Sequence, residues 1–298
     1  MTTNNHIYLV EYSEQNRDWK LYRLWSRFAM FYGCDWDERH IYVAARDSPD
    51  FGGKHGEAIL RFDRSLRFID IWYRSREVLD VHQICIVDGS LWMTNTYYNG
   101  FRIIDLETRV ETDYFPYGNG TTPGSFERGD KNHFNTVRFD GKQVLMLANN
   151  SVVRAGLRRR KSKSRLLVVD PQTLRITKDV AVRGMAGHDV WIEDGAFRTC
   201  DSARGVICGP RNASYTSVEP WLRGVAITDR IMFMGKSFQA ARDQRAAGNG
   251  QLLAIDRKTQ KIVSRTEIAG SGGVYDMMLL DEPDLARFGK APFRVETP

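Results

Sequence analysis

The feature that most constrains the fold of this chain is an internal repeat of about fifty residues. Part of each repeat is an apolar run that ends in Asp, followed by a short polar turn and an alternating strand. The four clear copies carry Asp63, Asp105, Asp170 and Asp256. Because an Asp at this place accepts hydrogen bonds from its own turn, and because β-branched residues suit the flanking strands, each copy predicts a β-hairpin.

A second kind of hairpin occurs in the same repeats. Its marker is an Asp-Gly pair between alternating runs, as at Asp88-Gly89, Asp140-Gly141 and Asp194-Gly195, with looser copies near Asp37 and Asp229. Asp-Gly favours a two-residue hairpin turn in which both residues have positive φ. Two hairpins in each repeat make a four-stranded sheet, which is the blade of a β-propeller.

The repeat predicts an all-β fold, a single β-propeller domain over residues 1–298, with six blades. The fourth repeat is short, so five or seven blades remain open. The last repeat lacks an outer hairpin, and residues 7–25 have that pattern without an inner pair. Pairing the N- and C-terminal strands in one blade therefore closes the propeller. The inner strands are expected to begin near Tyr32, His82, His133, His188, Arg223 and Tyr275.

Composition is that of a globular protein, with 42% hydrophobic and 27% charged residues. The N-terminal segment has no apolar signal region, and no run of eighteen uncharged apolar residues occurs, so we expect a soluble cytoplasmic protein without membrane association. The four cysteines form no Cys-x-x-Cys pair, and they are expected to be buried free thiols rather than ligands of a zinc knuckle.

The alternating hairpins resemble those of the NHL, strictosidine-synthase-like and virginiamycin-lyase-like propeller families. A closer likeness is to a bacterial propeller family of unknown function. The short motifs that carry this second likeness lie between residues 80 and 280: Val81-His82, Asn132 to Asn135, Arg223 to Ala226, Gly235 to Ser237, and Gly273 to Asp276. The resemblance implies a propeller with recurring polar positions, and it implies no established reaction.

Three of the six histidines, His82, His133 and His188, stand at or next to the predicted start of an inner strand. Since inner strands line the channel of a propeller, these side chains are expected to converge on one face. Three imidazoles and a water can hold a divalent metal such as zinc or iron, and an imidazole also serves as a general acid or base. The alternative is that each histidine only hydrogen-bonds a neighbouring blade.

Arg223 is expected at the same mouth, where its guanidinium fork suits a carboxylate or phosphate. It joins the three histidines as a predicted catalytic residue, and its alternative role is an ion pair with Asp201 or Asp276. Other polar side chains are predicted to line the ligand pocket: Asn95, Asn135, Asn149, Asp201, Lys236 and Tyr275. For those at the ends of second strands the alternative is that they bridge adjacent blades: Asn95, Asn149, Asp201 and Lys236.

The net charge of +6 permits an anionic partner, and basic residues gather in the run 158–163, in the loop 237–250 and at Lys54 and His55. Such a run is alternatively a solvated loop. No helix–turn–helix or RNA-binding module is evident, so nucleic acid is not an expected partner. Nothing in the sequence indicates an oligomeric state.

These observations predict a propeller that binds an anionic small molecule at a mouth lined by histidine and arginine. It would act on that molecule as a lyase or hydrolase, through acid/base or metal-assisted chemistry. The alternative function is a non-catalytic scaffold whose basic face docks an acidic protein or polymer.

Overall fold

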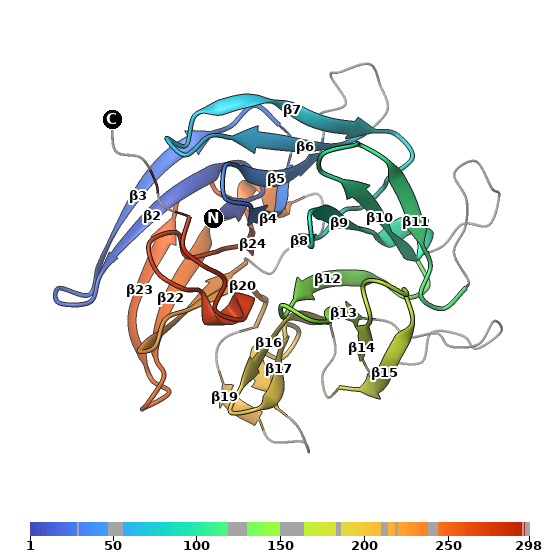
Figure 1. Cartoon of the computed structure of the whole chain (residues 1–298). Coiled ribbons are helices and arrows are strands. Elements are labelled where there is room, and N and C mark those ends of the chain that lie inside the picture. Colours follow the sequence, from blue (N-terminus) through green and yellow to red (C-terminus); the bar gives the residue numbers. More distant parts are fainter. Residues whose placement is uncertain are drawn as a thin grey trace. The chain divides into compact units, whose positions relative to one another are not determined.

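The computed structural model describes residues 1–28, 30–46, 56–118, 130–149, 164–182, 186–209, 214–217, 220–237, 244–293 and 295. These residues form an all-β propeller fold with six four-stranded antiparallel blades (Figure 1), which confirms the predicted fold class and blade number. The helical elements among the described residues are the 3₁₀ turns η1 (Thr96–Tyr98), η3 (Arg245–Ala247) and η4 (Leu285–Arg287).

The chain divides into two compact units. The first unit comprises residues 1–74 and 219–298, the second comprises residues 75–218, and each is described separately. The single domain over residues 1–298 stays a prediction.

The first unit contains three blades, one of which joins the two ends of the chain. In that blade the order is β24 (Val274–Asp276), β1 (Thr2–Thr3), β2 (Ile7–Ser13) and β3 (Asp18–Trp25), so the two ends of the chain share a blade whose outer hairpin is residues 7–25, as predicted. The second strand of this blade is the short β1, in which Thr2 pairs with Asp276. The other two blades are β4 (Met30–Trp36), β5 (Ile41–Arg46), β6 (Glu57–Phe62) and β7 (Phe68–Ser75), and β20 (Leu222–Ile227), β21 (Ile231–Lys236), β22 (Gly250–Asp256) and β23 (Ile262–Ile268).

The second unit contains the other three blades. They are β8 (Ile84–Val87), β9 (Ser90–Asn95), β10 (Gly100–Asp105) and β11 (Glu111–Tyr114); β12 (Phe134–Phe139), β13 (Val144–Ala148), β14 (Arg165–Val169) and β15 (Ile176–Ala181); and β16 (Gly187–Glu193), β17 (Ala196–Asp201), β18 (Val206–Cys208) and β19 (Ser214–Ser217). The inner strand β12 contacts both β8 and β16, so neighbouring inner strands of this unit lie beside one another.

Buried apolar side chains from adjacent blades form the core of each unit. In the second unit Trp92, Phe101 and Phe134 belong to one buried cluster, and in the first unit Phe31 and Trp36 belong to another. The four cysteines are buried and free, as expected.

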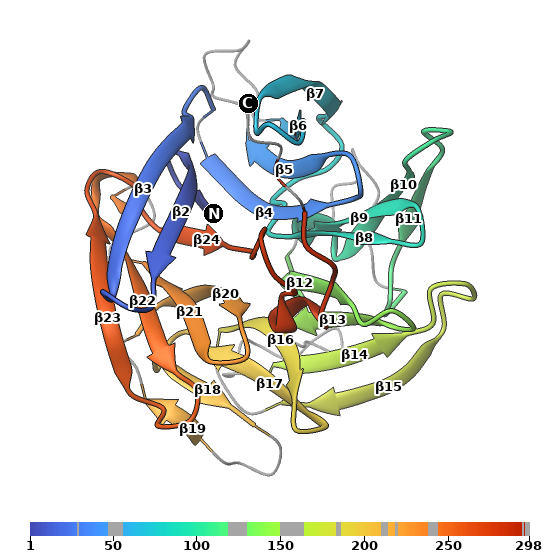
Figure 2. The same ribbon diagram turned by 60° about the vertical axis from the view of Figure 1, so that its left-hand side comes forward.

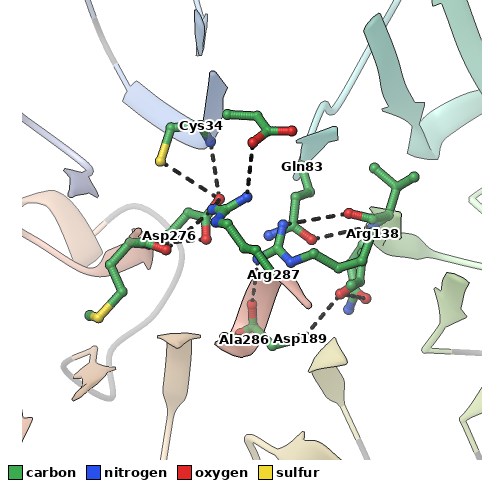
Figure 3. A network of polar contacts seen from close by, with 12 residues as sticks. Cys34, Gln83, Arg138, Asp189, Asp276, Ala286 and Arg287 are labelled. Carbon is green, nitrogen blue, oxygen red and sulfur yellow. Dashed lines mark hydrogen bonds and ion pairs between the residues drawn. The ribbon is translucent and has the colours of Figure 1, made fainter. Parts of the chain in front are cut away.

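Buried ion pairs lie among the inner strands of each unit (Figure 3). In the second unit Arg138 on β12 donates to Asp189 on β16 at 3.2 Å. In the first unit the segment after β24 carries η4, which packs on β20 (Figure 2). This turn places Arg287 against Asp276, with 3.1 Å between Nη2 and Oδ2. Both arginine side chains are almost fully buried.

The repeated aspartates cap their hairpin turns through their side chains. Asp105 accepts the backbone N–H of Thr108 at 2.7 Å, and Asp170 accepts that of Gln172 at 2.8 Å. Of the Asp-Gly turns, the pairs at 88–89 and 194–195 have positive φ at both residues. The pair at 140–141 differs, because only Gly141 has positive φ and the Asp140 carboxylate instead accepts two backbone N–H groups of its turn.

These turns predict a loss of stability in acid. The hydrogen bond from the Thr108 N–H, then that from the Thr108 hydroxyl, lowers the pKa of Asp105. A carboxyl whose pKa is lower in the folded chain stabilises the fold above its unfolded pKa of about 3.9, and that contribution is lost as the pH falls through the folded pKa. We therefore expect the urea concentration at half-unfolding to fall less steeply with decreasing pH in Asp105→Asn than in the wild type, below about pH 4. Glu107→Gln in the same turn is the control, and an unchanged slope in Asp105→Asn would contradict the prediction.

Candidate metal centre

Three potential metal ligands gather in the second unit. Asp80, His82 and His133 each offer one ligand atom, and these atoms lie within 4.8 Å of one another. His82 Nε2 lies 3.4 Å from Asp80 Oδ2, and the rings of His82 and His133 are 4.9 Å apart between centroids. All three residues are partly buried. The structure thus brings together two of the predicted histidines and adds a carboxylate that the sequence analysis did not select.

The spacing of this cluster fits a shared transition-metal ion. Two donors at about 2.1 Å from a tetrahedral ion lie about 3.4 Å apart, which equals the separation of His82 Nε2 from Asp80 Oδ2. Two imidazoles on one ion have centroids about 4.5 to 5.2 Å apart for angles between about 90° and 109°, and the observed value of 4.9 Å falls in this range. The two measured separations are therefore those expected for ligands of a common ion.

The segment that carries Asp80 and His82 is held by the end of β9. The backbone N–H of His82 donates to Thr94 Oγ1 at 2.8 Å, and that of Leu79 donates to Asn95 Oδ1 at 3.0 Å. Asn95 is almost fully buried. This predicted pocket residue thus holds the loop that carries the candidate ligands.

The segment that precedes β12 is held by the connection between β9 and β10, which belongs to the neighbouring blade. Asn99, just after η1, accepts the backbone N–H groups of Lys131 and Asn132 at 2.6 and 2.9 Å, and Thr96 donates to the carbonyl of Phe134. Residues 95–99 therefore position both loops of the cluster. The signal in the sequence is the pair of asparagines, Asn95 and Asn99, that flanks η1 between β9 and β10, because Asn readily bonds backbone groups in turns.

Asp130 forms an outer contact of the cluster. Its Oδ2 lies 2.5 Å from His133 Nδ1, a position that favours a proton on Nδ1 and leaves the lone pair of Nε2 for a metal. Among the described residues, neither Asp130 Oδ1 nor Asn149 Oδ1 has a hydrogen-bond partner, although both atoms are buried. Asn149 is next to His133, since its backbone N–H donates to the His133 carbonyl. Buried acceptors without donors are costly, and they favour a cation or a ligand that donates.

Backbone conformation also marks this cluster. Asp80 and His133 have φ values of 61° and 49°, in the left-handed region, and neither stands in one of the repeated hairpin turns. Such conformations cost free energy and gather at functional sites, although Asp and His tolerate them better than most residues.

His188 makes different contacts from the other two histidines. Its Nδ1 lies 2.9 Å from Ser202 Oγ and 2.8 Å from the carbonyl oxygen of Ala186. Among the described residues the candidate ligand group contains Asp80, His82 and His133 and does not include His188. A site made by all three predicted histidines stays a prediction.

Two further predicted pocket residues of the second unit make structural contacts. Asn135 Nδ2 donates to the carbonyl of Gly187 at 2.7 Å, which bridges two blades. Asp201 accepts the backbone N–H of Arg204 at 3.3 Å in the turn between β17 and β18. The ligand contacts predicted for these two residues stay predictions.

The remaining predicted site residues belong to the first unit. The Arg223 guanidinium lies over the Tyr275 ring, with 5.4 Å between Cζ and the ring centroid. Lys236 ends β21, and burial, followed by the nearby charge of Arg265, lowers its pKa.

The basic run 158–163, Lys54, His55 and residues 238–243 lie outside the described residues. No helix in the described part of the chain is long and apolar enough to cross a membrane.

Comparison with known proteins supports the fold. No family model matches the chain, and no curated protein matches it. A chain in the crystal structure of a nidogen/laminin complex is similar at a TM-score of 0.57 and 8% identity, over 93% of this chain and 96% of that one. Luciferin-regenerating enzyme is similar at a TM-score of 0.56 and 11% identity, over 90% of this chain and 83% of that one. At such low identity these likenesses show a shared propeller fold and no shared activity.

Proposed function

We propose that this propeller binds a divalent transition-metal ion through Asp80, His82 and His133 and acts on an anionic small molecule there, as a hydrolase or lyase. The observation that carries the proposal is the convergence of two imidazoles and one carboxylate within 4.8 Å. Mixed nitrogen and oxygen donors suit zinc, iron or manganese better than calcium or magnesium, which prefer oxygen ligands.

The ligand set leaves coordination positions for water and substrate. A metal held by three protein groups lowers the pKa of a bound water to about 7 and polarises a substrate oxygen. An anionic oxygen of the substrate is attracted to such an ion, and the net charge of +6 favours approach of anions. In this proposal Asp80, His82 and His133 hold the ion, Asp130 orients His133, and His188 remains the candidate for proton transfer.

Elemental analysis of the purified protein tests the metal site. We expect stoichiometric zinc, iron or manganese in the wild type and its loss in His82→Ala and His133→Ala. His188→Ala distinguishes two alternative ligand sets. The variant should keep the metal if Asp80 is the third ligand, and it should lose the metal if His188 is the third ligand. His40→Ala is the matched control, since His40 also lies near an aspartate three residues earlier, with 3.8 Å between His40 Nδ1 and Asp37 Oδ1.

Thermal unfolding provides a second measurement. A metal that binds only the folded chain raises the melting temperature. Addition of zinc, manganese or ferrous iron to chelator-treated protein should therefore stabilise the wild type and His40→Ala, with no effect on His82→Ala. Absence of metal in the purified wild type, together with no shift for any of the three ions, would overturn the metal proposal.

Catalysis is tested with metal-loaded and chelated protein on a panel of carboxylate-bearing lactones and phosphate esters. We expect turnover by the loaded wild type and by His40→Ala, and loss of turnover on chelation or in His82→Ala. Turnover that survives both changes would overturn the assignment of the reaction to this cluster.

A further inference from the structure

The two segments that carry the candidate histidine ligands are held by the same kind of contact. Thr94 Oγ1 accepts the backbone N–H groups of residues 82–83, at 2.8 and 3.2 Å. Asn99 Oδ1 accepts the backbone N–H groups of residues 131–132, at 2.6 and 2.9 Å. In each case one side-chain oxygen binds two consecutive N–H groups, at or directly before a histidine of the candidate metal centre.

Both oxygens belong to one short, buried stretch of chain. Thr94 lies near the end of β9 and Asn99 directly follows η1, so only residues 95–98 separate them, and both residues are fully buried. The backbone N–H of Asn99 donates to the Thr96 carbonyl at 3.1 Å, and the Thr96 hydroxyl donates to the Phe134 carbonyl. The strand β12 also contacts both β8 and β9. The segments before β8 and β12 are therefore fixed relative to one rigid element.

We propose that Asn99, together with Thr94, is a positioning residue that makes the candidate metal centre a tetrahedral site selective for zinc, which rests on the proposed function that an ion binds there. Two donors at about 2.1 Å from an ion lie about 3.4 Å apart in tetrahedral geometry and about 3.0 Å apart in octahedral geometry. His82 Nε2 lies 3.4 Å from Asp80 Oδ2, which favours the tetrahedral arrangement.

A fixed tetrahedral spacing discriminates between metals that bind the same donor atoms. The affinity of an ordinary nitrogen and oxygen site rises from manganese through cobalt and nickel to copper, so selectivity for zinc has to come from geometry. Zinc has no geometric preference of its own and accepts a tetrahedral site, whereas nickel favours square-planar or tetragonal sites. A ligand set that is held rigidly therefore favours zinc, and a loosened set adapts to nickel.

The backbone at the ligands explains why these anchors are needed. Asp80 and His133 have φ values of 61° and 49°, in the left-handed region, which costs free energy and persists only where the surroundings enforce it. The Asn99 oxygen binds the two N–H groups directly before His133. Loss of that oxygen should let this segment relax while every proposed ligand atom remains in the chain.

Metal binding by chelator-treated protein tests the proposal through affinities and a spectrum. Competition with a chelating dye gives the affinities for zinc and nickel, and the visible absorption of cobalt-loaded protein reports its geometry, because tetrahedral cobalt absorbs far more strongly than octahedral cobalt. We expect the wild type to prefer zinc over nickel and to show intense cobalt bands. Asn99→Gly keeps the left-handed backbone but removes the oxygen. It should bind zinc about 10- to 100-fold more weakly, with a smaller preference over nickel and weaker cobalt bands.

Further variants separate positioning from a general loss of stability. Asn99→Asp keeps an oxygen for both N–H groups and should recover the zinc affinity and the cobalt bands. Thr94→Val removes the matching oxygen at the other segment and should also weaken zinc binding. Asn4→Ala is the control, because Asn4 is equally buried and its Oδ1 accepts the Gly273 N–H at 2.6 Å in the first unit. It should unfold at a lower temperature and bind zinc as the wild type does.

The possible outcomes distinguish this proposal from the metal proposal itself. A wild type that binds zinc but has weak, octahedral cobalt bands would contradict the tetrahedral assignment. Zinc affinity and cobalt bands that are unchanged in both Asn99→Gly and Thr94→Val would contradict the positioning role, and the metal centre would stand. A wild type that binds none of the three ions would instead refute the proposed function, together with the role of Asn99.

Discussion

Replacement of Arg287 by Ala is expected to destabilise the first unit by about 3 to 5 kcal/mol, the usual cost of removing one partner from a buried ion pair. The Arg287 side chain is 3% exposed and faces three buried carboxylates. Its nitrogens lie 3.1 Å from Asp276, 3.6 Å from Asp35 and 3.8 Å from Asp284. Without the guanidinium these groups lose their common cation, and Lys290 remains only beside Asp35.

The position of Asp276 explains why the effect spreads beyond one turn. Its Oδ2 accepts the backbone N–H of Cys34 at 3.0 Å, and its own N–H donates to Thr2 Oγ1 at 3.1 Å. Asp276 therefore ties β24 to β1 within the blade that joins the two ends of the chain, and to β4 in another blade of the same unit. In Arg287→Ala the carboxylates left without the guanidinium repel one another, and this repulsion should weaken that blade first.

The loss should depend on pH. Burial is the largest influence on the pKa of Asp284 and raises it, whereas Arg287 lowers it. In Arg287→Ala the folded pKa therefore rises further above the unfolded value. A carboxyl with a raised folded pKa stabilises the fold below its unfolded pKa and costs stability as the pH rises toward the folded pKa. The difference in urea midpoint between variant and wild type should thus be largest at neutral pH and smaller near pH 4.

Arg67→Ala is the matched control for charge removal. Arg67 also pairs with an aspartate, at 2.9 Å from Asp63, but its side chain is 77% exposed. Because exposed pairs contribute little, this variant should change stability by less than about 1 kcal/mol. Equal, small effects of Arg287→Ala and Arg67→Ala on urea unfolding would show that the buried network does not stabilise the unit as argued.

The fold followed from local patterns because each hairpin carries its own turn chemistry. Asp105 and Asp170 make the turn hydrogen bonds that their spacing predicted, and the unmatched strands at the two termini pair with each other. The Arg287 network was not predictable in the same way. The segment after Asp276 has no repeat pattern, so nothing in the sequence shows which carboxylates Arg287 will meet.

The candidate site was only partly predictable, because residues that look equivalent in the repeat have different registers. His82 lies two residues before β8 and His133 directly before β12, whereas His188 is the second residue of β16. A shift of one residue sends a side chain to the opposite face of a strand. Asp80 was missed because its role depends on the left-handed turn that brings it back toward His82, which no hairpin signal marks.

Removal of the outer carboxylate at Asp130 is expected to weaken metal binding by about 10- to 100-fold, which is the usual effect of losing a group that orients a metal-bound histidine. Asp130→Asn keeps an acceptor for the His133 Nδ1 proton but removes its charge, so it should bind metal more tightly than Asp130→Ala. Loss of a ligand in Asp80→Ala should weaken binding more than either. Affinities from competition with a chelating dye give this order directly.

Asp37→Asn provides the control for the Asp130 series, since Asp37 and His40 have the same sequence spacing as Asp130 and His133. The candidate ligand group found among the described residues contains neither Asp37 nor His40. It should leave metal affinity unchanged. A positioning role also predicts rescue, because Asp130→Glu restores the charge near His133 and should recover part of the affinity lost in Asp130→Ala. If Asp130→Ala bound metal as tightly as the wild type, Nδ1 of His133 would not need its carboxylate. The assignment of Nε2 as the metal-binding atom would then lose its basis.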